Sequence, residues 1–117
     1  MTQTAAGPVL TIDIEKCTNN TAIVHCHGRL VAGVTDVLST GVCQLLPHTK
    51  RIILDLTDLK HTDSMGLGAL VRLYVSAKSA GSSLELKNLS KQIQHLLGLT
   101  NMLSVFTVLG EDGAKWM

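Results

Sequence analysis

The sequence predicts an α/β fold in which a single domain holds a mixed β-sheet with helices packed on it. The chain has 117 residues, a length that suits one hydrophobic core. Its apolar residues recur with a period of two in some segments and with spacings of three and four in others. Read in sequence order, these segments give β β α β α β α β. Because strands joined through helices are usually parallel, we expect a partly parallel sheet in one domain over residues 1–117, with a core over about residues 9–110.

The first two segments predict an antiparallel hairpin. Residues 9–14 alternate apolar and polar side chains, and the turn-forming residues 18–20 lead into a second run that starts at Thr21 and reaches Gly28. The second run has one apolar face and one face with two histidines: Ala22, Val24 and Cys26 against Ile23, His25 and His27.

The middle of the chain predicts a helix, a buried strand and a polar loop. Apolar residues from Val34 follow helical spacing up to a stop near Pro47. Residues 52–56 form a nearly continuous apolar run, which indicates a central strand covered on both faces. We expect residues 57–63 to form a polar loop.

The remaining segments complete the alternation. A second helix is predicted to begin about Ser64 and to fade before Gly81, and residues 84–87 alternate as a strand. A short helix over residues 89–97 is predicted to close at Gly98, because glycine commonly ends helices. A last strand is predicted over residues 105–109.

Composition excludes several classes of protein. Ten basic and nine acidic residues leave almost no net charge, whereas proteins that bind nucleic acid need a concentrated positive face. No apolar stretch approaches the roughly 20 residues of a membrane-spanning helix. The first eight residues do not form a secretion signal, so a cytoplasmic location is expected. Three cysteines without a CxxC spacing are expected to be reduced, partly buried thiols.

The segment around Ser64 carries the strongest functional signal. Ser64 suits the N-cap position of the second helix, where its hydroxyl would accept a backbone N–H. Free N–H groups and the helix dipole also make this position favourable for a phosphate. Gly66 and Gly68 in the first helical turns cost roughly 1 kcal/mol each relative to alanine, which suggests a need for close approach or an open surface. Asp58 and Asp63 are expected in the same loop.

Three other functions, a hydrolase, a dinucleotide-binding protein and a metal-binding protein, have weaker support in the sequence. A hydrolase would use Ser64 as nucleophile and His61 as base, but no orienting acid completes a triad. The glycines at 66 and 68 match only part of a dinucleotide-binding loop. His25 and His27 share a strand face, yet two ligands do not make a structural metal site. We therefore expect neither an enzyme nor a bound cofactor or metal.

Several stretches of the chain resemble one family. Asp63-Ser64-Met65-Gly66-Leu67-Gly68, which follows Ile53-Leu54-Asp55-Leu56, resembles the STAS domain of bacterial anti-sigma factor antagonists. The segments Gly28-Arg29-Leu30, Ala80-Gly81 and Leu86-Lys87-Asn88-Leu89-Ser90 are also similar to that family's pattern.

The resemblance implies a protein that, when unphosphorylated, binds an anti-sigma factor serine kinase and frees the sigma factor. Phosphorylation of Ser64 would switch this binding off, and a phosphatase would reset it. The partner-binding residues expected on this basis surround the serine: Asp58, Thr62, Asp63, Ser64, Met65, Gly66 and Gly68.

Two departures keep a second hypothesis open. Val31 stands where many members have Asp, and Met65 stands where Ser is frequent. STAS domains also occur in stress-sensing complexes and in transporters, so the alternative is a non-enzymatic scaffold subunit without a phosphoswitch. The sequence leaves the oligomeric state open.

Overall fold

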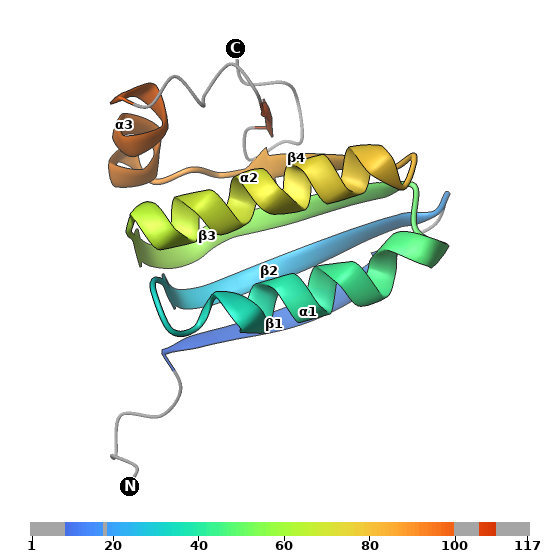
Figure 1. Ribbon diagram of the computed structural model, residues 1–117, viewed down its shortest axis with the longest axis horizontal. Helices are drawn as coiled ribbons and strands as arrows, with labels where there is room; N and C mark the ends of the chain where they lie inside the picture. Colours follow the sequence, from blue (N-terminus) through green and yellow to red (C-terminus); the bar gives the residue numbers. More distant parts are fainter. Residues whose placement is uncertain (1–8, 18, 100–105, 110–117) are drawn as a thin grey trace, which may run out of the picture.

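A computed structural model describes residues 9–17, 19–99 and 106–109 of the chain (Figure 1). The elements follow the predicted alternation, with one short 3-10 turn, η1, after the first helix. Their bounds are β1 Leu10–Cys17, β2 Thr21–Leu30, α1 Thr35–Leu45, η1 Leu46–His48, β3 Arg51–Thr62, α2 Ser64–Ser79, β4 Ser83–Lys87, α3 Lys91–Leu99 and β5 Thr107–Leu109. The predicted limits of the domain, residues 1–117 with a core over about residues 9–110, include residues outside the described ranges and stay predictions. The predicted start of the last strand at Val105 also lies outside the described residues.

The strands form one mixed sheet, as predicted. Its order is β1-β2-β3-β4-β5, with β1 antiparallel to β2 and the remaining neighbours parallel. β3 lies in the centre of the sheet, which explains the apolar run at its start. The turn between β1 and β2 contains Asn19 and Asn20, and both have positive φ values, a conformation that asparagine tolerates well.

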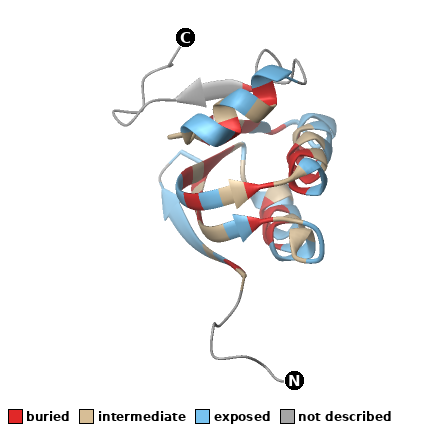
Figure 2. Ribbon diagram, turned by 90° about the vertical axis from the view of Figure 1, so that its left-hand side faces the viewer, coloured by how far each residue is buried: buried red, intermediate tan, exposed pale blue. Residues whose placement is uncertain are grey.

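Helices α1 and α2 lie side by side on one face of the sheet (Figures 1 and 2). Both begin at the edge where β2 and β3 end, so this edge brings together the starts of the helices. The core between sheet and helices is mostly aliphatic, as the composition predicts, and residues such as Val24, Leu38, Leu54 and Leu70 are fully buried. Neither α1 nor α2 covers the opposite face of β1, β2 and β3, which we call the outer face (Figure 2), and α3 contacts β3.

The predicted polar loop over residues 57–63 is wrong, because β3 continues to Thr62. Its second half pairs with β2 from His27 to Leu30, and the register shifts twice, between His25 and His27 and between Gly28 and Arg29. Such irregularities break the period of two that identifies a strand in sequence. Leu56 and Leu59 are both buried although they lie three positions apart.

The third helix also differs from its prediction. It begins at Lys91, and the hydroxyl of the preceding residue, Ser90, accepts the Ile93 N–H at 3.2 Å. The helix continues through Gly98 to Leu99. Gly98 does not adopt the positive φ that a glycine stop requires. The predicted closure at Gly98 is therefore wrong.

Candidate functional site

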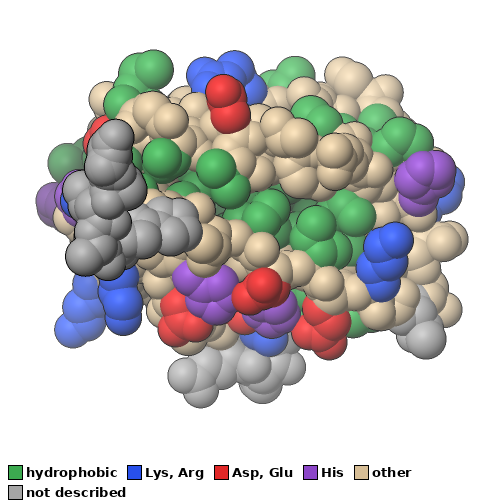
Figure 3. Space-filling view, turned by 90° about the horizontal axis from the view of Figure 1, so that it is seen from below, with side chains coloured by type: hydrophobic (Ala, Val, Ile, Leu, Met, Phe, Trp, Pro, Cys, Tyr) green, Lys and Arg blue, Asp and Glu red, His purple; other side chains and the backbone are tan. Residues whose placement is uncertain are grey.

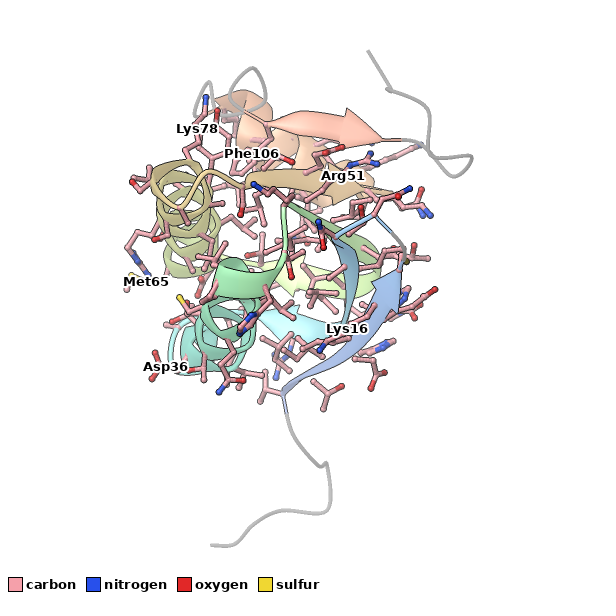
Figure 4. All side chains as sticks on the ribbon, turned by 90° about the vertical axis from the view of Figure 1, so that its right-hand side faces the viewer. Lys16, Asp36, Arg51, Met65, Lys78 and Phe106 are labelled. Atoms are coloured by element: carbon pink, nitrogen blue, oxygen red, sulfur yellow. The ribbon has the colours of Figure 1, made fainter. Side chains whose placement is uncertain are left out.

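Ser64 lies where the sequence predicts it, at the start of α2 and exposed to solvent. Met65 beside it is 54% exposed and points away from the sheet (Figure 4). Within the described residues, no hydrogen bond engages the Ser64 hydroxyl. A neutral hydroxyl and a thioether chain therefore form the outer surface of this helix start.

The N-cap of α2 is Asp63, which corrects the prediction that Ser64 caps the helix. One carboxylate oxygen of Asp63, Oδ1, accepts the Gly66 N–H at 2.9 Å, and the other, Oδ2, accepts the Ala32 N–H at 3.1 Å. The hydrogen bond from Gly66, which has the largest effect, and the one from Ala32 hold the pKa of the Asp63 carboxyl below its usual value of 3.8. Aspartate and serine are both good N-caps, and the contact with Ala32, distant in sequence, selects Asp63.

The expected row of free N–H groups is correspondingly shorter. The Gly66 N–H bonds to the Asp63 side chain, and the Leu67 N–H bonds to the Asp63 carbonyl at 2.9 Å. A phosphate on Ser64 would thus meet a helix start whose donors are largely engaged, beside an ionised carboxylate. The dipole of α2 remains as a favourable contribution.

Thr62 and Gly66 support the site from beneath. The Thr62 side chain is 3% exposed and donates to the Leu30 carbonyl at 2.6 Å. A Cβ atom at position 66 would lie 2.1 Å from that carbonyl oxygen and 2.3 Å from Thr62 Oγ1. Only glycine fits there without displacement of the backbone. Both residues are buried, and their predicted contact with a partner stays a prediction.

Gly68 has a different environment. It is half-buried, and a Cβ atom at this position would meet only Arg72 Nη1, at 3.4 Å. The fold does not require glycine there. A flat surface on the exposed side of α2 is the remaining explanation, and Gly68 stays a predicted partner contact.

Asp58 does not lie beside Ser64. Its Oδ2 is 3.1 Å from Nδ1 of His27, on the outer face of the sheet. Sequence reasoning placed it near Ser64 because residues 57–63 were expected to form a loop. The correct placement needs the pairing of β3 with β2, which a single sequence does not state.

The outer face carries two histidine bridges that the sequence did not predict. His25 lies between Glu15 and Asp55, with 3.0 Å from a ring nitrogen to each carboxylate. His27 lies between Asp13 and Asp58, at 3.0 and 3.1 Å. Figure 3 shows acidic side chains and histidines gathered along this side of the molecule. The alternation of Asp13 and Glu15 along β1, set against the histidines of β2, was the available signal.

The alternative chemistries gain no support from this geometry. No group of three or more His, Cys, Asp or Glu side chains in the described part of the chain is arranged to hold a metal ion. Among the described residues, no hydrogen bond joins His61 and Ser64. The three cysteines are free, with Cys26 buried and Cys17 and Cys43 exposed.

Among the described residues, no helix combines the length and the hydropathy needed to cross a bilayer.

Comparison with known proteins gives a consistent result. The model of the STAS domain family matches residues 12–111. A curated relative, the anti-sigma-B factor antagonist of Bacillus subtilis (strain 168), is 31% identical over 83 residues, which cover 67% of this chain and 76% of the relative.

Solved structures show the same fold. The anti-sigma factor antagonist SpoIIAA in its unphosphorylated form matches with a TM-score of 0.73 at 15% identity, over 87% of this chain and 90% of that one. A sulfate transporter family protein from Wolinella succinogenes matches with a TM-score of 0.74 at 21% identity, over 86% of both chains.

Proposed function

Because this chain belongs to the STAS domain family, we propose that it is a cytoplasmic anti-sigma factor antagonist controlled by phosphorylation of Ser64. In its unphosphorylated form it binds an anti-sigma factor with serine kinase activity, and the sigma factor is released. Phosphorylation by that kinase ends the binding, and a phosphatase restores it. The observation that carries the proposal is the exposed position of Ser64 at the start of α2.

The separation of capping from exposure supports this role. Because Asp63 caps α2, the Ser64 hydroxyl is available to a kinase without loss of the cap. Thr62 and Gly66 fix the helix start against the carbonyl of Leu30, so the serine is presented on a rigid support. A rigid, exposed hydroxyl suits recognition by a partner, and it also suits the transfer of a phosphoryl group to the Ser64 oxygen.

The charge balance explains how phosphate would end binding. A phosphoserine carries about −1.5 to −2 charges at pH 7. The neighbouring Asp63 carboxylate is held in its ionised form by the Gly66 and Ala32 N–H groups, so the two charges repel. A partner surface that fits the neutral hydroxyl and the exposed Met65 would have to desolvate this combined charge. Affinity should fall while the fold is kept.

A labelling and calorimetry experiment tests the proposal. A candidate anti-sigma factor kinase is incubated with the protein and ATP, and mass spectrometry locates the phosphate. We expect it on Ser64, and we expect Ser64→Ala to lose labelling while Ser76→Ala, on an exposed position further along α2, keeps it. Phosphorylation should weaken binding by at least about 100-fold, or about 2.8 kcal/mol at 1.4 kcal/mol per tenfold.

Circular dichroism of both forms provides the control for folding. Equal affinities of the two forms, a phosphate on another residue, or a phosphorylated form that has unfolded would each contradict the proposed switch.

The alternative is a scaffold subunit without a switch. A sulfate transporter family protein has the same fold, so the fold is compatible with this alternative. Neighbouring genes for transporter or scaffold components, together with absence of Ser64 labelling, would support this alternative. A kinase-like anti-sigma factor gene beside this one supports the phosphoswitch.

A further inference from the structure

The His25 bridge, made of Glu15, His25 and Asp55, joins three strands of the sheet. His25 Nε2 lies 3.0 Å from Glu15 Oε1 on the edge strand β1, and Nδ1 lies 3.0 Å from Asp55 Oδ2 on the central strand β3. Both contacts have hydrogen-bond geometry. The backbone register between β2 and β3 shifts immediately after His25, so a side-chain link forms where the ladder becomes irregular.

The chemistry of the three side chains requires a particular protonation state. An ionised carboxylate only accepts hydrogen bonds, whereas a neutral imidazole has a single N–H to donate. Both contacts of His25 are hydrogen bonds only when both ring nitrogens carry a proton. The hydrogen bond to Glu15, ahead of the opposing effect of burial and the further contribution of Asp55, raises the pKa of His25 above 6.5.

We propose that the His25 bridge is a proton-dependent tie that holds the edge strand β1 to the centre of the sheet when the imidazole is doubly protonated. This goes beyond the proposed function and does not depend on it. When His25 loses one proton to solvent, it keeps a single donor for two carboxylates. One of the two contacts then becomes a contact between two acceptors.

The exposure of the two carboxylates decides which contact is lost. The Asp55 side chain is 13% exposed and is also held by Thr57, whose N–H donates at 3.0 Å. The Glu15 side chain is 58% exposed and moves into solvent readily. A neutral His25 therefore keeps its Nδ1 proton toward Asp55 and releases Glu15, so that the weakened strand is β1.

Among the other charges around His25, the carboxylates of Asp13 and Asp58 favour the protonated imidazole and the cation of Lys87 opposes it. Asp13 on β1 and Asp58 on β3 both contact His27, the neighbouring imidazole on β2. Lys87 on β4 pairs in register with Asp55. Beneath them, burial, with the Asp55 charge adding to it, raises the pKa of the Cys26 thiol to about 12, so this thiol stays neutral. Loss of a proton from His25 leaves carboxylates in excess on this face.

The pH window follows from the directions of the shifts. The folded pKa of His25 is raised, so its contribution is fully present below 6.5 and is lost as pH rises through the folded pKa. Burial opposes the bonds from Thr57 and His25, but together these bonds hold the pKa of Asp55 below 3.8, so Asp55 weakens the bridge only in stronger acid. The tie is complete in mildly acidic solution and opens toward mildly alkaline solution.

Amide hydrogen exchange and imidazole NMR test this proposal. We expect the protection of residues 12–16 in β1, relative to that of β4, to fall severalfold between about pH 6 and about pH 8, after correction for intrinsic exchange. The NMR titration should place the pKa of His25 above the ordinary imidazole value of 6.5 and show the Nδ1–H tautomer at high pH.

Three variants sharpen the result. His25→Gln should remove the pH dependence of β1 protection, His48→Gln should leave it unchanged, and Glu15→Gln should lower the pKa of His25. Glu15 is exposed, so that variant is expected to fold even where His25→Gln does not. Equal relative protection of β1 at both pH values, or a pH dependence that survives His25→Gln or Glu15→Gln, would overturn the proposal.

Discussion

The start of α2 and the outer face of the sheet use polar side chains in opposite ways. At the start of α2, Thr62 and Asp63 bond to backbone groups at the end of β2 and just after it, at Leu30 and Ala32. On the outer face, charged side chains bond to one another across three strands. The Thr62 hydroxyl and the Asp63 carboxyl do not titrate near neutral pH, whereas an imidazole does. The first arrangement provides a constant support, and the second responds to solution conditions.

The largest expected effect comes from Gly66→Ala at the start of α2. The added methyl would overlap the Leu30 carbonyl, so we expect a loss of about 3 kcal/mol in the free energy of unfolding, typical of strong overpacking. Gly68→Ala is the matched control, because its methyl meets only the flexible end of Arg72 and helix propensity then gains about 0.5–1 kcal/mol. Urea denaturation measures both, and equal effects would contradict the distinction between the two glycines.

A smaller loss is expected from Thr62→Val. The substitution keeps the shape but removes the donor to the buried Leu30 carbonyl, at a cost of about 1–2 kcal/mol. This cost should be the same at about pH 6 and about pH 8, because neither group titrates there. Thr40→Val, at an exposed position of α1, should cost less. A cost for Thr62→Val that changes with pH would break the contrast with the outer face.

The smallest expected effect is that of Asp63→Asn near neutral pH. Asparagine also caps helices but cannot accept from both Gly66 and Ala32, so the thermal midpoint should fall only slightly. The pKa of Asp63 is lowered, so its contribution is present above 3.8 and is lost as pH falls through the folded pKa.

Thermal denaturation at a series of pH values from neutral to acidic shows where the stabilising contribution of the ionised Asp63 carboxylate is present and where it is lost. The variant should lack the part of the acid destabilisation that Asp63 causes, whereas Asp36→Asn, on the first turn of α1, should retain it. An unchanged acid limb in Asp63→Asn would show that the two N–H bonds do not hold this carboxyl ionised.

Sequence periodicity was sufficient for the order of elements and for the exposed start of a helix at Ser64. It failed at residues 57–62, because register shifts in β2 and β3 break the alternation that marks a strand. It also could not choose between Asp63 and Ser64 as the cap, since the choice depends on a bond to Ala32, 31 positions away. His25 and Asp55 are 30 positions apart, and their contact follows only from the strand register.

The Leu30 carbonyl lies where the end of β2 packs against the start of α2. It accepts the Thr62 hydroxyl, lies against Gly66, and precedes Ala32, whose N–H bonds to Asp63. Ala32 and Gly33 are exposed, and the Ala32 N–H bonds to Asp63, the residue before Ser64, although Ala32 lies 31 positions earlier in the chain. The surface at the start of α2 is therefore discontinuous in sequence, and a linear peptide copied from residues 60–70 would lack the Ala32 segment that bonds to Asp63.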